Sequence, residues 1–255
     1  MKNKISYILI HKVLPIVFWI SVWEIASIII NQSHFLPSVS ETFNALIKVV
    51  SSREFPRVVG MSLLRIFEGI TLGTLFGIIL AILSYKFTFV HSLISPFNSV
   101  IKATPVASII ILLWISMNGH NLAVFVSLLM VFPIIWQNVY DAFSSIDNNL
   151  VEVSRVFQFS FKKKMTILVL PSLKKFFIPA FITSIGLAFK AEIAAEIIAG
   201  VKNSIGQMIY YAKDKPATDE MFAWTIIGIF FSILFESLAR ILLSPPKKNK
   251  SEVVI

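Results

Sequence analysis

The chain contains no cysteine among its 255 residues, which excludes disulfides and thiolate metal sites. Its four histidines, His11, His34, His91 and His120, are too widely spaced for an H-E-x-x-H metal site. The chain also lacks the G-x-x-x-x-G-K-S/T loop that cradles nucleotide phosphates and the G-x-S-x-G turn that presents a nucleophilic serine. We therefore expect no catalytic residues, no metal site and no cofactor in this chain, and we do not predict an enzyme.

Charge is also scarce in this sequence. Only 15% of the residues are charged and 56% are hydrophobic, with a mean hydropathy of +0.80. An ordinary soluble domain is about 25% charged and about 45–50% apolar. The composition therefore indicates an integral membrane protein in contact with lipid. The net charge of +9 fits loop charges that set membrane topology better than it fits nucleic-acid binding.

Six apolar stretches are candidates for crossing a bilayer, which takes about 20 mostly apolar residues in a helix. These are Val13–Ile30, Val59–Tyr85, a shorter one at Ala103–Met117, Leu122–Tyr140, Phe176–Gly200 and Met221–Leu243. The stretch SETFNALIKVVSSREF after the first span has the spacing of a short helix on the membrane surface. The predicted fold class is all-α, a polytopic membrane bundle of about six transmembrane helices.

The first apolar run also has the character of a signal peptide, because three lysines precede it. However, the run is long, contains Glu24 and is followed by NQSHFLPS, which has no small-x-small cleavage pattern. We therefore expect a retained helix. The predicted regions are 1–58 (first helix and surface segment), 59–243 (core, with a cytoplasmic loop at 141–175) and 244–255 (basic tail).

The placement of Lys and Arg predicts the orientation, because cytoplasmic loops of membrane proteins are enriched in both. With a cytoplasmic N-terminus, fifteen lie inside: Lys2, Lys4, Lys12, Lys86, Lys102, Arg155, Lys162, Lys163, Lys164, Lys174, Lys175, Arg240, Lys247, Lys248 and Lys250. Six lie outside: Lys48, Arg53, Arg57, Lys202, Lys213 and Lys215. We therefore expect both termini in the cytoplasm.

One predicted cytoplasmic loop carries the basic stretch VEVSRVFQFSFKKKMTILVLP, residues 151–171. Asp147 is a candidate cap for a first short helix, on which Leu150, Val153 and Phe157 share one apolar face. Ser160 is a candidate cap for a second short helix, which we expect to end at Pro171. A partner protein is one explanation for such a pair of helices. A solvated loop that only fixes topology is the other.

The spacing of this loop resembles the signature loop of permease subunits of bacterial ABC importers. That pattern is E-A-A, three residues, G, nine residues and I-x-L-P. Here it reads Glu152-Val153-Ser154, three residues, Gln158, nine residues and Leu168-Val169-Leu170-Pro171. Gln158 departs from the family's glycine, which sits at a bend where positive φ is cheap for glycine alone.

The segments FLPSVSETFNAL, SLLRIFEGITLGTLFGIILAIL, KATPVASIIILLWISM, AAEIIAG and SIGQMIYYAKD resemble, in the same order, permeases of the nitrate/sulfonate/taurine importer subfamily. The resemblance covers residues 36–243 and implies a type I importer fold in the bacterial cytoplasmic (inner) membrane. It also implies a second permease copy, an extracytoplasmic solute-binding protein and two cytoplasmic subunits that bind ATP and Mg. The implied solute is a nitrate-, sulfonate- or taurine-like anion or a related small molecule, and nothing in the sequence chooses among them.

In that family the signature loop is the coupling element that docks on the ATPase. The resemblance therefore assigns ATPase coupling to Glu152, Ser154, Arg155, Phe157, Gln158 and Pro171. Glu152, Ser154 and Arg155 are candidates for polar contacts with the partner. Phe157, Phe159 and Phe161 are either aromatic anchors at that interface or packing residues of the chain's own bundle.

Three charged residues interrupt the fifth apolar span. Glu192 and Glu196 share a face of the helix, whereas Lys190 lies about 200° away from Glu192. Burying a charge at the membrane centre costs roughly 2.5–3.5 kcal/mol on insertion scales, so these residues either line a water-filled path or form ion pairs, for instance with Arg65 or Lys102. Glu196 falls where the subfamily often has an acidic residue.

Three glycines in the second apolar span predict how that helix packs. Gly69, Gly73 and Gly77 form a stripe at i+4 steps that predicts close helix packing, within the chain or between two copies.

The alternative function is a secondary transporter driven by an ion gradient, with Lys190, Glu192 and Glu196 as a proton relay. That alternative needs no docking loop with this spacing.

Overall fold

The structure is a computed structural model that describes residues 13–243. The early lysines Lys2, Lys4 and Lys12, and the tail expected at 244–255, lie outside the described residues. The elements of the described part are α2 (Leu14–Ile30), α3 (Val39–Val50), α4 (Phe55–Lys86), α5 (Thr88–Ala103), α6 (Val106–Trp114), α7 (Gly119–Ser144), α8 (Asn148–Val156), α9 (Phe161–Lys164), a π-helical turn (Met165–Val169), α10 (Leu170–Ala199), α11 (Ile205–Asp214) and α12 (Thr218–Leu243). Within residues 13–243 every regular element is helical, which confirms the all-α class.

Four helices are long and apolar enough to cross a membrane: α4, α7, α12 and the continuous run Phe161–Ala199. The 17-residue α2 is apolar but shorter. The third predicted span, Ala103–Met117, is wrong. Instead, α5 and α6 form a bent pair that turns by 100°. The break lies at Thr104–Pro105, because a proline disfavours helical backbone in the residue before it.

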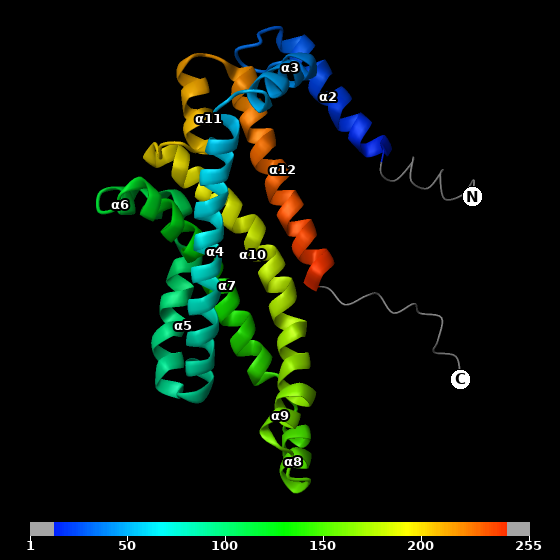
Figure 1. Ribbon diagram of the computed structural model, residues 1–255, viewed down its shortest axis with the longest axis vertical. Helices are drawn as coiled ribbons and strands as arrows, with labels where there is room; N and C mark the ends of the chain where they lie inside the picture. Colours follow the sequence, from blue (N-terminus) through cyan, green and yellow to red (C-terminus); the bar gives the residue numbers. More distant parts are fainter. Residues whose placement is uncertain (1–12, 244–255) are drawn as a thin grey trace, which may run out of the picture.

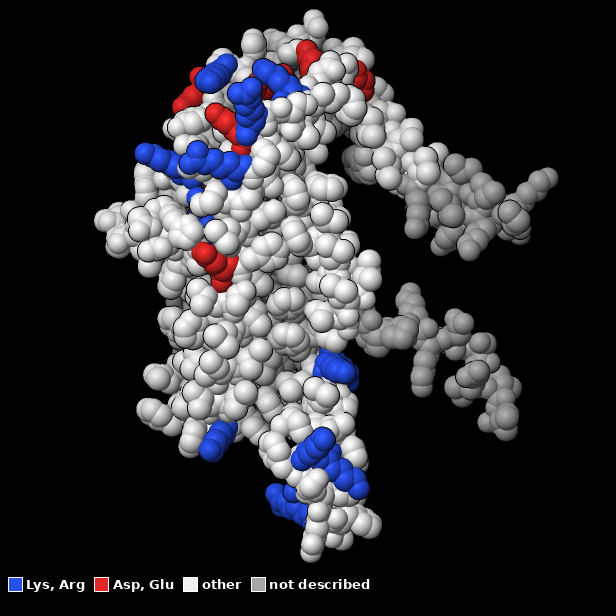
Figure 2. All heavy atoms as spheres, in the orientation of Figure 1, with Lys and Arg blue, Asp and Glu red and all other residues white. Residues whose placement is uncertain are grey.

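The helices run between two ends of an elongated molecule (Figure 1). One end carries α3 and α11, and the other carries α8 and α9. On the face drawn in Figure 2, both signs of charge cover the first end, Lys and Arg alone mark the opposite end, and an uncharged belt separates them. This distribution is typical of a protein whose middle lies in hydrocarbon.

Helix α7 forms the centre of the bundle, and α4 packs closely against it along the glycine stripe. An added Cβ at Gly69 would lie 2.4 Å from Cβ of Ser127, and the corresponding contacts of Gly73 and Gly77 with α7 are 2.8 and 2.9 Å. The three glycines therefore pack within the chain, because any side chain there would separate the two helices. Trp136 on α7 is 1% exposed, and its Nε1 donates to Oγ of Ser84 on α4 at 3.0 Å.

Helix α2 is joined to the rest of the molecule through its C-terminal half. Glu24, the one acid in that span, accepts a hydrogen bond from the backbone N–H of Val39 at 2.8 Å. Trp23 Nε1 donates to the carbonyl of Pro37 at 3.0 Å. Helix α3 begins at a capping box in which Ser38 and Glu41 satisfy each other's backbone N–H groups. The charge in the first apolar run therefore has a structural role at the start of α3.

Candidate functional site

The loop at 145–170 folds as two short helices joined at a left-handed residue. Asp147 caps α8 by accepting from the N–H of Asn149 at 2.8 Å, and Ser160 caps α9 by accepting from the N–H of Lys163 at 3.4 Å. Between them Gln158 has a φ of 47°. The bend therefore has the positive φ that glycine adopts easily, although the residue is a glutamine, and a left-handed non-glycine residue costs about 1–2 kcal/mol.

An apolar surface faces outward on this loop. It consists of Leu150, Val153, Val156, Phe157 and Phe161, and their exposed fractions range from 45% for Val153 to 78% for Phe161. Phe157 and Phe161 therefore do not pack against the chain's own bundle, which was the alternative explanation for them. We call these five residues the loop face.

The polar residues of the loop divide into two groups. Glu152 and Arg155 are exposed and stand beside the loop face. Ser154 is 1% exposed, and its hydroxyl donates to the carbonyl of Val151 at 2.7 Å. The expected polar contact of Ser154 with a partner is therefore wrong, because its hydroxyl is buried and used inside the loop. Phe159 is half-buried, with Lys163 Nζ 4.0 Å from its ring centroid.

The second short helix does not end at Pro171. Instead, α9 continues through the π-helical turn Met165–Val169 into α10, where Pro171 occupies the first turn. A proline is tolerated there because the first N–H groups of a helix have no partner within that helix. The N–H of Leu170 reaches back to the carbonyl of Met165, a five-residue step. Helix α10 thus joins the loop directly to the membrane core.

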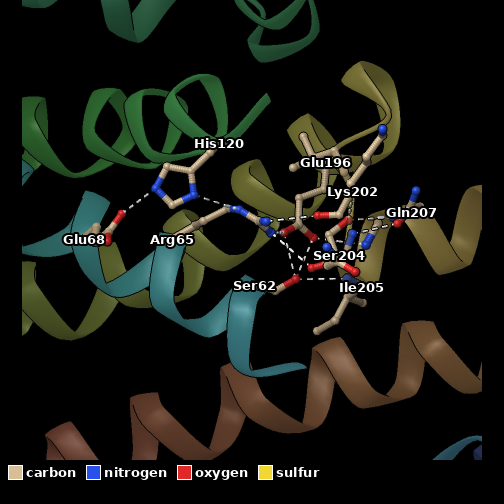
Figure 3. Close-up of polar contacts among 12 residues, drawn as sticks. Ser62, Arg65, Glu68, His120, Glu196, Lys202, Ser204, Ile205 and Gln207 are labelled. Carbon is tan, nitrogen blue, oxygen red and sulfur yellow. Dashed lines mark hydrogen bonds and ion pairs between the residues drawn. The ribbon is translucent and has the colours of Figure 1, made fainter. Parts of the chain in front are cut away.

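A second cluster of polar residues is buried near the other end of α10, around Glu196 (Figure 3). Arg65 on α4 donates from Nη1 to Oε1 of Glu196 at 2.9 Å, and Ser62 donates to both of its oxygens at 2.7 and 2.9 Å. Arg65 and Glu196 are 3% and 0% exposed. Arg65 and Lys102 were the two partners expected for the charged residues of this span, and the structure pairs Arg65 with Glu196.

Helix α11 also contributes to this cluster. The N–H of Gly206 donates to Oε2 of Glu196 at 3.0 Å, and the N–H of Ile205 donates to Ser62 Oγ at 2.9 Å. Arg65 Nη2 donates to the carbonyl of Lys202 at 3.0 Å. The cluster therefore joins α4, the end of α10 and the start of α11.

A chain of hydrogen bonds leads from Arg65 toward the surface. Its Nε donates to Nδ1 of His120 at 3.3 Å, and His120 Nε2 lies 3.1 Å from Oε2 of Glu68 (Figure 3). Because Nδ1 accepts, we assign the ring proton to Nε2, which donates to Glu68. The side chains of His120 and Glu68 are 41% and 40% exposed.

Sequence reasoning missed Ser62, His120 and Gly206 in this cluster. The only sequence signal for Ser62 was its i, i+3 spacing from Arg65 on one helix face. Gly206 lies in a stretch that resembles the importer subfamily, but nothing in the sequence connects it with Glu196.

Glu192 lies one turn before Glu196 and is also fully buried. Among the described residues, neither of its carboxyl oxygens has a hydrogen-bond partner. Glu192 and Glu196 therefore face inward together, and of the two Glu196 is the one paired within residues 13–243.

Lys190 lies elsewhere on α10, is exposed and lines a cavity of about 500 Å³ between α10, α11 and α12.

The expected position of Lys102 in a cytoplasmic loop is wrong. Lys102 lies in the last turn of α5 and lines a second cavity, of about 270 Å³, with residues of α7 and with Leu187 of α10. Its position follows from α5 beginning at Thr88, earlier than the predicted span.

Comparisons with known proteins agree with this architecture. The sequence profile of the family described as binding-protein-dependent transport system inner membrane component matches residues 73–244. A protein of Bacillus subtilis (strain 168) that carries the name aliphatic sulfonates transport permease protein SsuC is 23% identical over 226 residues, covering 88% of this chain and 81% of that protein. The crystal structure of an amino acid ABC transporter with histidines superposes with a TM-score of 0.56 at 17% identity, covering 72% of this chain and 88% of that chain. That structure shares the fold.

Proposed function

This chain belongs to the family of binding-protein-dependent transport system inner membrane components, and from that premise we propose that it is the membrane-spanning permease subunit of an ATP-driven importer. It provides the path for a small solute across the cytoplasmic membrane. It works with two cytoplasmic ATP-binding subunits, an extracytoplasmic solute-binding protein and a second permease copy. ATP and Mg bind to the ATP-binding subunits.

The loop face carries this proposal. Five apolar side chains stand exposed beside Glu152 and Arg155, at the spacing of the importer signature loop. Buried aromatic residues dominate interface energies, so Phe157 and Phe161 are the anchors for the ATP-binding subunit. Glu152 and Arg155 contribute polar contacts around them. A loop that only set topology would need no outward apolar surface.

The continuous helix supports a mechanical role for this loop. The π-helical turn links α9 to α10 without a break, so Phe161–Ala199 forms one 39-residue run. Movement of the loop with a partner is therefore passed along α10 to the buried cluster at Glu196. Rigid elements that move as units are the usual means by which such transitions spread.

The solute is proposed to be a small anion of the sulfonate, nitrate or taurine type, or a related small molecule. The similarity to SsuC supports this class, at 23% identity. We also propose that both termini are cytoplasmic. The end of the molecule that carries only Lys and Arg in Figure 2 is then the cytoplasmic end, with α8 and α9.

Co-purification of the tagged chain from its native membranes tests the proposal. We expect a stoichiometric ATP-binding subunit in the wild type and at least about a tenfold loss in Phe157→Ala/Phe161→Ala, since each anchor carries 2 kcal/mol or more at a typical interface. Phe89→Ala is the matched control, because Phe89 is 79% exposed on α5 outside the loop. A chain recovered alone that moves solute on an ion gradient would support a secondary transporter instead.

Cysteine crosslinking gives a second readout, because the chain has no cysteine of its own. A single cysteine at Val156 or Phe157 should crosslink to the ATP-binding subunit, and one at Phe89 should not. Failure at every exposed position of the loop would rule out the docking role.

A further inference from the structure

Two lysines lie deep in the membrane-spanning part of the molecule. Lys190 is fifteen positions beyond Lys175 on α10, and Lys102 is fourteen positions beyond Thr88 on α5. At 1.5 Å per residue these are rises of about 22 and about 21 Å. The hydrocarbon core is about 30 Å thick, so a helix that enters the bilayer near Lys175 or near Thr88 places its lysine inside the core and at a similar depth.

Neither lysine is neutralised by a carboxylate of the described residues. Within residues 13–243, no acidic side chain lies within ion-pair distance of Lys102 or Lys190, and both lysines are exposed. Glu236 lines the same cavity as Lys190, but Arg240 Nη2 lies 2.9 Å from its Oε1. Charged side chains inside a membrane face a protein interior or a water-filled space, because lipid does not solvate them.

The two cavities lie on one side of α10. Gly186, Lys190, Ile193 and Ile197 line the cavity against α12, and Leu187 lines the one against α5 and α7. At 100° per residue, Lys190 points about 40° from Gly186 and about 60° from Leu187, so it lies between the two cavities. We call the exposed residues there, Thr183, Leu187 and Lys190, the lysine face.

The chemistry of the walls suits an organic anion. Apolar side chains such as Phe189, Trp224 and Ile229 form most of the cavity against α12, with hydroxyls from Thr225 and Ser232. Glu192 and Glu196 are buried away from the lysine face, so they do not cancel its charge there. An ammonium group set in an apolar wall attracts an anionic end group while the wall accommodates carbon.

We propose that the lysine face lines the solute path and that Lys190 and Lys102 act as its charge filter, admitting small organic anions in preference to cations. This inference rests on the proposed importer function and assigns two residues of the path.

Cysteine labelling tests the filter directly, because the chain offers a cysteine-free background. A cysteine is placed at Ser232, in the full chain in its native membranes. Two thiol reagents of similar size are compared, 2-sulfonatoethyl methanethiosulfonate, which is itself an alkylsulfonate, and the cationic 2-(trimethylammonio)ethyl methanethiosulfonate. Each rate is divided by the rate of the same reagent with a free thiol. We expect a normalised anion-to-cation ratio of about 10 or more, because a charged site raises the local concentration of counter-ions at least tenfold.

Lys190→Gln in the same background should bring that ratio close to one. Lys213→Gln is the matched control, because Lys213 is exposed on α11 outside both cavities and its loss should leave the ratio unchanged. Thr104→Cys with Lys102→Gln repeats the test in the second cavity, which Thr104 lines.

Two results would overturn the proposal. One is a ratio that does not respond to either lysine substitution. The other is the absence of labelling by both reagents at Ser232→Cys and Thr104→Cys, which would mean that lipid or protein fills both cavities. Co-purification of the ATP-binding subunit with these variants keeps the two proposals separate. If the ATP-binding subunit still co-purifies while the cysteine labelling gives either of these two results, only the charge filter is wrong.

Discussion

Arg65 and Glu196 form a fully buried ion pair across 131 residues of sequence, with Nη1 and Oε1 2.9 Å apart. Hydrogen bonds from Ser62 and Gly206 complete the coordination of the carboxylate. A buried pair contributes little compared with an apolar replacement, but removing one partner leaves an uncompensated charge. The pair therefore fixes how α4, α10 and α11 meet, and it is sensitive to single substitutions.

Glu196→Gln should destabilise the protein by about 3–5 kcal/mol, because Arg65 would remain buried without its counter-charge. The measurement is thermal unfolding of the purified chain in lipid nanodiscs, together with membrane yield. Glu192→Gln is the matched control, one turn away and equally buried, and it removes a carboxyl that has no partner among the described residues. We expect a change below about 1 kcal/mol for the control. Equal stability and uptake in the two variants would exclude a structural role for the Glu196 pair.

Gly206→Ala should disrupt the same cluster from the side of α11. An added Cβ would lie 2.4 Å from Cβ of Glu196 and 2.6 Å from the backbone nitrogen of Ile197, so the two helix ends would have to move apart. Gly60→Ala is the control, because an added Cβ there meets nothing within 4 Å and alanine favours a helix by about 0.5–1 kcal/mol. Thermal unfolding should therefore shift in opposite directions for the two variants. A stabilising shift in both variants would mean that the Gly206 contact relaxes at no cost.

Much of the fold is predictable because apolar helices long enough to cross a membrane are recognisable by hydropathy alone. The same signal misplaced the third span, because α5 carries polar residues such as His91, Asn98 and Lys102 and is much less apolar than α6, so only the second half of the bent pair stands out by hydropathy. Pro171 was misread for a related reason. Proline ends a helix that precedes it but is well tolerated in the first turn of one that follows.

The buried cluster was predictable only in part. Glu196 required a positive partner because it lies in an apolar helix, and Arg65 was one of two candidates. Ser62 and His120 were not predictable, since a serine and a histidine carry no signal of a partner more than fifty residues away in the sequence. Gly206 was not predictable either, although Glu196 is only ten residues before it, because a glycine carries no sequence signal of a backbone hydrogen bond to a side chain. The burial of Ser154 was missed because it depends on how α8 packs against the rest of the chain, which the sequence does not show.

The cap of α3 predicts a local dependence on pH. The backbone N–H of Ser38 donates to Glu41 Oε2 at 2.7 Å, and this bond, with that from Ser33, lowers the pKa of Glu41 below its ordinary value of 4.5. A lowered pKa means that the cap stabilises α3 above pH 4.5 and is lost as the pH falls through the pKa of the folded state. Amide exchange in α3, corrected for its intrinsic pH dependence, should therefore show less protection in acid. Glu41→Gln should lack this transition, and persistence of the transition in that variant would assign it to another group.

Gln158→Gly should rigidify the loop that carries the proposed docking surface. Gln158 has a φ of 47°, where a side chain costs about 1–2 kcal/mol, whereas glycine adopts that angle freely and loses part of the gain through its larger entropy in the unfolded chain. The expected net stabilisation is about 0.5–1 kcal/mol, seen as slower amide exchange in α8 and α9. Gln158→Val provides the opposite test, because a β-branched residue is disfavoured at positive φ, and exchange should become faster. The side chain of Gln158 is exposed, so neither substitution removes a buried contact. Slower exchange in both variants would show that the backbone angle at Gln158 does not determine the stability of α8 and α9.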